Sequence, residues 1–140
     1  MNILVVIEHS QDSIHRLSKE AIVGAQSLGG TVTALIIGTG SEESISFLKA
    51  CDIEKVLIVD HELVKSYNAD GYASIVSQVI ETLSPNLIVA GHTYQTRDFM
   101  PRVSAKLRIP FIPDIVSMNN NKFVKQILNA KLNAEISPKS

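Results

Sequence analysis

Residues 87–107 read LIVAGHTYQTRDFMPRVSAKL and predict a strand, a loop and a helix in succession. Its first four residues are apolar, as expected of a strand in a parallel sheet that is covered on both faces. A polar loop follows and leads into a helix whose apolar residues share one face: Phe99, Met100, Val103 and Leu107. A strand, loop and helix in this order bring polar groups to the edge of a parallel sheet, where open α/β sheets usually bind ligands.

The same alternation extends through most of the chain. Apolar runs rich in β-branched residues predict three further strands, at 3–7, 31–37 and 55–59. Runs with helical spacing of apolar residues lie between the strands and predict helices at 12–28, 41–51 and 72–83. Near the C-terminus we expect a fifth strand at 112–117, a turn at 119–121 and an added antiparallel strand at 123–127.

These elements predict an α/β fold. We expect a doubly wound three-layer sandwich with a mostly parallel sheet, Rossmann-like and of the adenine nucleotide alpha hydrolase-like kind, closed by a C-terminal antiparallel hairpin. The 140 residues, 45% of them hydrophobic, suit a single domain over residues 1–140.

Pro101 indicates where the helix after residue 90 should begin. A proline inside a helix costs about 3 kcal/mol, but in the first turn its missing N–H has no partner to lose. With Asp98 as N-cap, Pro101 falls in the first turn, so we expect both residues to be structural. Arg102 should also be structural, because its guanidinium can bind a carboxylate such as Asp114 in a bidentate way.

Composition excludes several classes of function. The formal net charge is -1 and the 13 Lys and Arg residues are spread along the chain, so we expect neither a nucleic-acid nor a membrane partner. The single Cys51 excludes an intramolecular disulfide and a thiolate metal cluster. We see neither an apolar run of about 20 residues nor a leader segment, and therefore expect a cytoplasmic protein.

Two histidines follow predicted strands that should be neighbours at the switch point of the sheet. His9, His92 and the adjacent Thr93 are therefore the candidates for a ligand crevice. A histidine–carboxylate base, the core of a hydrolase, or a metal site of two histidines and one carboxylate could be imagined there, but neither spacing matches a known motif. Strand-end histidines more often bond loop carbonyls. We predict no catalytic residue and no metal site.

The turn after the first strand argues against a phosphate site. Phosphate-binding loops need glycines, because the backbone must come close to the anion. Residues 8–12 read EHSQD and contain no glycine. An adenine-nucleotide binder resembling universal stress proteins remains the alternative, although Gly91 is the only glycine in the loop after residue 90.

Several segments resemble the alpha subunit of electron transfer flavoproteins. The similar segments follow the family's order: 4–9, 28–32, 53–57, 101–107 and 114–115. The most specific of them is Pro101-Arg102-x-x-Ala105-x-Leu107, which lies at the family's spacing from its flanking strands. The resemblance covers residues 3–127.

The resemblance implies a role for these residues. In that family an N-terminal α/β domain precedes a C-terminal domain that holds most of the FAD contacts, so the FAD-binding domain is absent here. FAD would belong to the assembled heterodimer, with none bound by this chain alone. The implied partners are the beta subunit, flavin dehydrogenases that act through the complex, and a quinone oxidoreductase that accepts the electrons.

The resemblance also implies that this chain is a scaffold rather than an enzyme. Arg97, which precedes the expected cap, would face the beta subunit together with Tyr94 and Gln95. Whether the isolated domain also forms a homodimer stays open.

Overall fold

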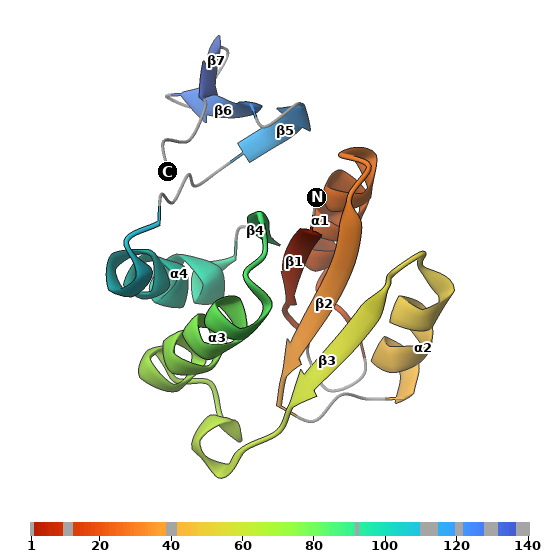
Figure 1. Ribbon diagram of the computed structural model, residues 1–140, viewed down its shortest axis with the longest axis vertical. Coiled ribbons are helices and arrows are strands. Elements are labelled where there is room, and N and C mark those ends of the chain that lie inside the picture. The colour runs from red at the N-terminus through yellow and green to blue at the C-terminus, as the bar shows by residue number, and fades with distance from the viewer. Residues whose placement is uncertain are drawn as a thin grey trace.

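The computed structural model describes residues 2–9, 13–38, 42–91, 93–109, 115–119, 122–127 and 132–136. Figure 1 shows strands and helices alternating as far as residue 107. The elements are β1 (Asn2–Ile7), α1 (Arg16–Ser27), β2 (Thr31–Ile37), α2 (Glu42–Ala50), β3 (Lys55–Val59), the 3-10 turn η1 (Glu62–Val64), α3 (Ala69–Leu83), β4 (Leu87–Ala90), α4 (Tyr94–Leu107), β5 (Ile115–Asn119), β6 (Lys122–Ile127) and β7 (Leu132–Ile136).

The first four strands form one parallel sheet in the order β3-β2-β1-β4. The chain moves outward from β1 to β2 and β3, and then returns across the sheet to place β4 on the other side of β1. This reversal puts the switch point between β1 and β4, the two strands that the sequence predicted to meet there. The predicted doubly wound α/β fold is confirmed.

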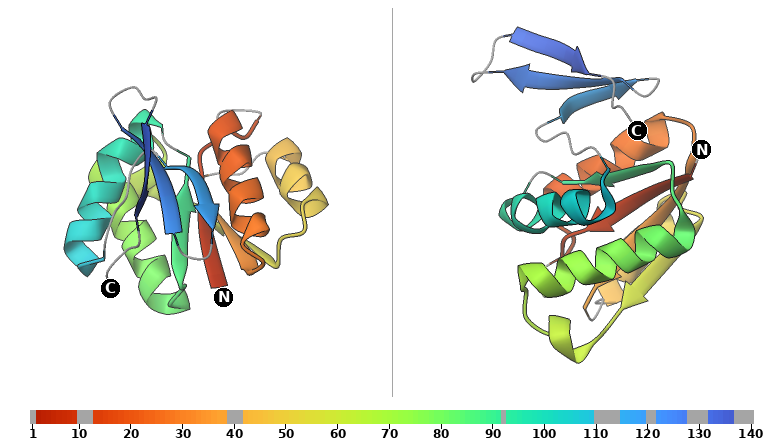
Figure 2. Two further views of the ribbon diagram at one scale, coloured as in Figure 1. Left: turned by 90° about the horizontal axis from the view of Figure 1, so that it is seen from above. Right: turned by 60° about the vertical axis from the view of Figure 1, so that its left-hand side comes forward.

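Helices cover both faces of this sheet. Figure 2 shows α1 and α2 on one face and α3 and α4 on the other. Because side chains alternate along a strand, Ile3 and Val5 of β1 pack with α1, whereas Leu4 and Val6 pack with α3 and α4. Burial on both faces explains why β1 is a continuous apolar run.

The C-terminal strands differ from the prediction in their sheet. β5, β6 and β7 form a separate antiparallel sheet, so the expected antiparallel pairing of residues 123–127 is confirmed, but in a sheet of its own. β5 begins at Ile115 and pairs with β6, and residues 112–114 of the predicted strand lie outside the described residues. Strands joined by short turns pair at a low cost in loop-closure entropy, which favours this local arrangement.

Two helices begin at other residues than expected. The N-cap of α4 is Thr93, whose side chain accepts a hydrogen bond from the Thr96 N–H, so the predicted start at Asp98 is wrong. Pro101 therefore lies inside the helix, where burial of the apolar face of α4 offsets its cost. The N-cap of α1 is His15, so this helix begins at Arg16 rather than near residue 12.

Candidate functional site

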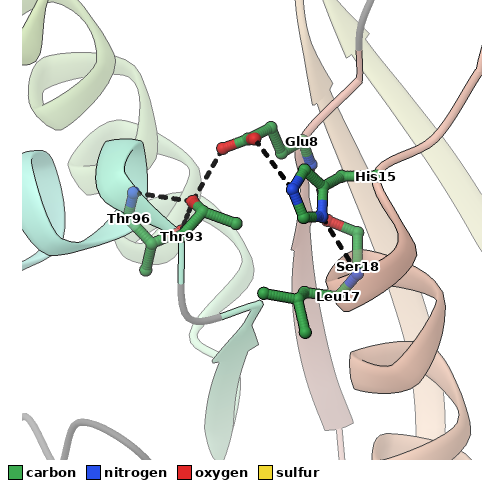
Figure 3. A network of polar contacts seen from close by, with 6 residues as sticks. All are labelled: Glu8, His15, Leu17, Ser18, Thr93 and Thr96. Carbon is green, nitrogen blue, oxygen red and sulfur yellow. Dashed lines mark hydrogen bonds and ion pairs between the residues drawn. The ribbon is translucent and has the colours of Figure 1, made fainter.

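Two residues that follow β1 and β4 meet at the switch point. Glu8 comes directly after β1, and Thr93 caps α4 after β4. The Thr93 hydroxyl donates a hydrogen bond of 2.7 Å to Glu8 Oε1, across 85 residues of sequence (Figure 3). The Glu8 side chain is only 21% exposed, so water screens this contact less than it would on an open surface.

Thr93 connects the Glu8 carboxylate to the first turn of α4. Its buried oxygen accepts from the Thr96 N–H at 3.1 Å and lies 3.2 Å from the Thr96 hydroxyl. Thr93 has one hydroxyl hydrogen, and Glu8 accepts it. The Thr96 hydroxyl must then be the donor in the contact between the two threonines.

His15 approaches the other oxygen of the same carboxylate. Its Nε2 lies 3.8 Å from Glu8 Oε2, and its Nδ1 accepts the Leu17 N–H at 3.0 Å (Figure 3). An accepting Nδ1 carries no hydrogen, so the neutral ring has its hydrogen on Nε2, facing Glu8. The N-cap side chains of α1 and α4 are thus both turned toward one carboxylate.

The backbone fixes Glu8 against α1 as well. Its N–H donates to the Ser18 hydroxyl at 2.8 Å, and its carbonyl accepts the His15 N–H at 2.8 Å. Ser18 is fully buried, so this bond lies away from solvent. The position of Glu8 is therefore set by its main chain and by both carboxylate oxygens.

Gly91 brings the loop after β4 against the first turn of α1. A Cβ at this buried glycine would lie 2.8 Å from the Leu17 carbonyl carbon and 2.8 Å from Leu17 Cβ. Only glycine permits such an approach of one backbone to another. The backbone that follows β4 therefore packs directly against α1 beside the switch point.

The Glu8 carboxylate supplies the negative charge that the N-terminal ends of α1 and α4 favour. In related folds the positive ends of helix dipoles hold an anionic ligand at this place. Here the Glu8 carboxylate lies beside both N-caps, and a phosphate bound next to it would meet a like charge. The described residues do not fit the pyrophosphate of FAD or of a nucleotide.

The predicted crevice residues divide into three cases. Thr93 lies in the site, as a partner of Glu8. His9 faces β2 instead, where its Nε2 lies 3.0 Å from the carbonyl oxygen of Ile37, the last residue of that strand. His92 lies outside the described residues, so its pairing with His9 stays a prediction.

The residues predicted to face a partner lie at the start of α4. Tyr94 is 85% exposed, and the Arg97 guanidinium carbon lies 5.1 Å from the centre of its ring. Gln95 is half-buried, and its carbonyl oxygen lies 3.4 Å from the Tyr67 hydroxyl oxygen.

Asp98 and Arg102 join α4 to the chain before it. Asp98 Oδ2 accepts a hydrogen bond of 2.7 Å from Tyr67, and Arg102 pairs with Asp70 at 2.6 Å. Burial, and next the hydrogen bond to Asp98, raise the pKa of Tyr67 above its ordinary range. Asp114, the expected partner of Arg102, lies outside the described residues.

Sequence reasoning missed several of these contacts. Tyr67 and Asp70 are 31 and 32 residues away from their partners, and no local pattern connects them. The only sequence signal for the role of Glu8 is that a charged residue directly follows a buried strand.

Within the described ranges, no three His, Cys, Asp or Glu side chains are placed to bind a metal ion, and no helix is long and apolar enough to cross a membrane.

Comparison with known proteins gives a consistent result. The Electron transfer flavoprotein domain family matches residues 3–139. The chain is 27% identical over 135 residues to the electron transfer flavoprotein subunit alpha of Bacillus subtilis, an alignment that covers 92% of this chain and 42% of the relative. It is 31% identical over 131 residues to the lactate dehydrogenase (NAD(+),ferredoxin) subunit LctC of Acetobacterium woodii, covering 89% of this chain and 31% of the relative.

A third relative agrees with these two. The electron transfer flavoprotein subunit alpha of Clostridium acetobutylicum is 30% identical over 95 residues, which cover 68% of this chain and 28% of the relative. The chain spans less than half the length of each of these relatives. Because the family match extends over nearly all of its residues, the chain belongs to the electron transfer flavoprotein family, as a domain of the alpha-subunit type.

Proposed function

We propose that this chain is the scaffold and partner-binding part of an electron transfer flavoprotein and that it holds no redox group itself. FAD would be held elsewhere in the assembled protein. The assembly would take electrons from flavin dehydrogenases and pass them to a quinone oxidoreductase, and the direct partner of this chain would be the beta subunit.

One observation carries the proposal. The Glu8 carboxylate lies between the N-caps of α1 and α4, where a sheet of this type would otherwise hold an anionic cofactor. A carboxylate at this position disfavours an anionic ligand and so favours a structural task for the domain. The chain matches less than half the length of each of these named alpha subunits, so the FAD of those flavoproteins could be held outside the matched part.

Association with a beta subunit tests the proposal. The chain is mixed with the purified electron transfer flavoprotein beta subunit of the same organism, with and without FAD, and passed over gel filtration. We expect the two proteins to elute together and the chain alone to elute without flavin absorbance. Separate elution would refute the partner, and a stoichiometric flavin band on the chain alone would refute the scaffold role.

A further inference from the structure

A histidine side chain caps two helical segments of this chain, α1 and η1. The Nδ1 of His15 accepts the Leu17 N–H at 3.0 Å, and the Nδ1 of His61 accepts the Leu63 N–H at 3.1 Å. The usual N-caps are Ser, Thr, Asp and Asn, which accept a hydrogen bond through a side-chain oxygen. A histidine cap differs from them, because its accepting nitrogen is also the atom that takes up a proton near neutral pH.

Protonation would change the hydrogen bonding at the start of α1. The neutral His15 ring accepts at Nδ1 and carries its hydrogen on Nε2. A protonated ring carries a hydrogen on each nitrogen, so it no longer accepts the Leu17 N–H. It would also place a positive charge at the positive end of the helix dipole. Both effects remove the cap of α1.

Glu8 gives the protonated ring another partner. Its Oε2 lies 3.8 Å from His15 Nε2, close enough for an ion pair but too far for a hydrogen bond (Figure 3). A charged N–H forms a shorter and stronger hydrogen bond to a carboxylate than a neutral one does. The His15 side chain is 41% exposed, so protons reach it from the solvent. The ring thus has two bonding states: a neutral one that caps α1 and a charged one that pairs with Glu8.

The surroundings of α1 leave this choice to the His15 proton. Within the described residues, Glu8 is the only carboxylate that pairs with the ring. β2 and β4 contain no charged residue, and α2 meets α1 through the Phe47 ring, over which the Lys19 ammonium lies at 4.7 Å. Lysine and arginine, here Lys19 and Arg16, keep their charge at neutral and mildly acid pH.

Glu8 is also approached by hydroxyl groups from α3 and α4. Burial, and next the charge of Glu8, raise the pKa of Tyr72, so this hydroxyl keeps its proton at neutral and acid pH. The Thr93 hydroxyl donates to Oε1, whereas His15 faces Oε2. An ion pair with His15 can therefore form while Thr93 keeps its bond to Glu8 and still caps α4.

The first turn of α1 also carries the contact with the backbone after β4. A Cβ at Gly91 would lie 2.8 Å from the Leu17 carbonyl carbon, so the two backbones touch at the residue whose N–H is capped. A helix end that loses its cap opens more often. Loss of the cap would therefore act on this contact.

We propose that His15 is a pH-sensitive N-cap, which releases the first turn of α1 when it is protonated and then pairs with Glu8. The release loosens the contact between α1 and the backbone after β4, and it leaves the start of α4 unchanged. The proposal concerns this chain alone and does not depend on the proposed function.

Nuclear magnetic resonance of the isotope-labelled full chain tests the pH-sensitive cap. Protection of amides from hydrogen exchange is measured from about pH 8 to about pH 5, the range in which histidine ordinarily titrates. The Leu17 amide reports the cap of α1 and the Thr96 amide reports the cap of α4. The shift of the Gly91 amide resonance reports the contact between the two backbones.

Two variants separate the two halves of the proposal. His15→Asn keeps a capping side chain that does not titrate. Glu8→Gln removes the charge and keeps an oxygen that can accept from Thr93. The Leu63 amide is the control within the same molecule, because His61 caps it in the same way and no described contact joins His61 to Glu8.

On acidification of the wild type, we expect the protection of Leu17 to fall by about threefold or more and the Gly91 resonance to shift over the same pH range. Thr96 should keep its protection. In His15→Asn the protection of Leu17 should stay constant. In Glu8→Gln the fall at Leu17 should move to lower pH, because the charged ring has lost its partner, whereas the fall at Leu63 should stay at the same pH.

Four results would overturn the proposal or one of its parts. No fall at Leu17 in the wild type, or an equal fall in His15→Asn, would overturn the pH-sensitive cap. A fall at the same pH in Glu8→Gln would overturn the pairing with Glu8. An equal fall at Thr96 would show a general loosening in acid, and an unchanged Gly91 resonance would refute the link to the backbone after β4.

Discussion

Thr93 is the residue on which the candidate site depends most. Its hydroxyl is both the N-cap of α4 and the hydrogen-bond donor to Glu8. Thr93→Val keeps the shape of the side chain but removes both functions, so we expect the free energy of unfolding to fall by about 1–2 kcal/mol. Thr93→Ser retains the hydroxyl and should lose much less. Urea denaturation measures the difference.

Asp98→Ala is the matched comparison for the start of this helix. If Asp98 were the cap, its removal would be the costlier change. In the structure it loses only an exposed hydrogen bond to Tyr67, so we expect a cost below that of Thr93→Val. The opposite order of the two variants would contradict the helix start at Tyr94.

Gly91 allows a test of how closely the backbone after β4 packs against the first turn of α1. In Gly91→Ala the new methyl group would meet backbone and Cβ atoms of Leu17 at 2.8 Å, and backbone atoms cannot move aside as a flexible side chain can. We therefore expect Gly91→Ala to destabilise the protein, measured as a lower midpoint of urea denaturation. An unchanged midpoint would contradict this close contact between the backbone after β4 and α1.

At the level of elements, Tyr67 links the loop before α3 to α4 and makes stability depend on pH. Burial and the bond to Asp98 raise the pKa of Tyr67 in the folded protein above its unfolded value of about 10. A group whose folded pKa is raised contributes stability that is complete below the unfolded pKa and is lost as the pH rises above it.

Tyr67→Phe should therefore flatten the loss of stability above about pH 10. The variant is expected to be less stable at neutral pH, by about 1 kcal/mol for the lost hydrogen bond. Tyr72, whose pKa is raised by burial and by Glu8, keeps its own contribution. Urea denaturation of the wild type and of Tyr67→Phe across the alkaline range checks this prediction. Parallel curves of unfolding free energy against pH would contradict it.

Ser77 is an unused polar group inside α3. Its side chain is fully buried, and its hydroxyl has no hydrogen-bond partner among the residues that the structure describes. A buried hydroxyl without a partner costs free energy, and alanine has the higher helix propensity. We expect Ser77→Ala to raise the free energy of unfolding by up to about 1 kcal/mol. A clear destabilisation would show that the hydroxyl is bonded after all.

The elements also show which parts of the fold are readable from sequence. β1 to β4 could be predicted because buried parallel strands are apolar runs, a local property. The start of α4 could not be predicted, because Thr93 and Asp98 are both good capping residues. Asp98 was favoured because it would place Pro101 in the first turn, where proline costs little. In the structure Thr93 is the cap, and the apolar face of the helix packs with residues of α3.

The candidate site was harder to predict than the fold. Sequence placed Thr93 at the switch point, because the ends of β1 and β4 had to meet there. Its bond to Glu8 crosses 85 residues, and the choice of hydrogen-bond partner depends on side-chain directions that no spacing rule gives. His9 shows the same difficulty, since it follows β1 but bonds the end of β2.

For the molecule as a whole, the charge at the switch point argues against a nucleotide ligand. Glu8 lies beside the N-caps of α1 and α4, and its carboxylate contacts Thr93 and His15. A phosphate bound beside this carboxylate would meet a like charge. We therefore propose that the domain binds no nucleotide there.

A calorimetric titration of the chain with AMP tests that claim most directly. AMP carries the phosphate and adenine that a Rossmann-like crevice would hold, and the Glu8 carboxylate should exclude it. We predict no binding tighter than about 1 mM, which corresponds to about -4 kcal/mol. Micromolar binding that is lost in Thr93→Val or His92→Ala would contradict the account and make the chain a nucleotide-binding domain.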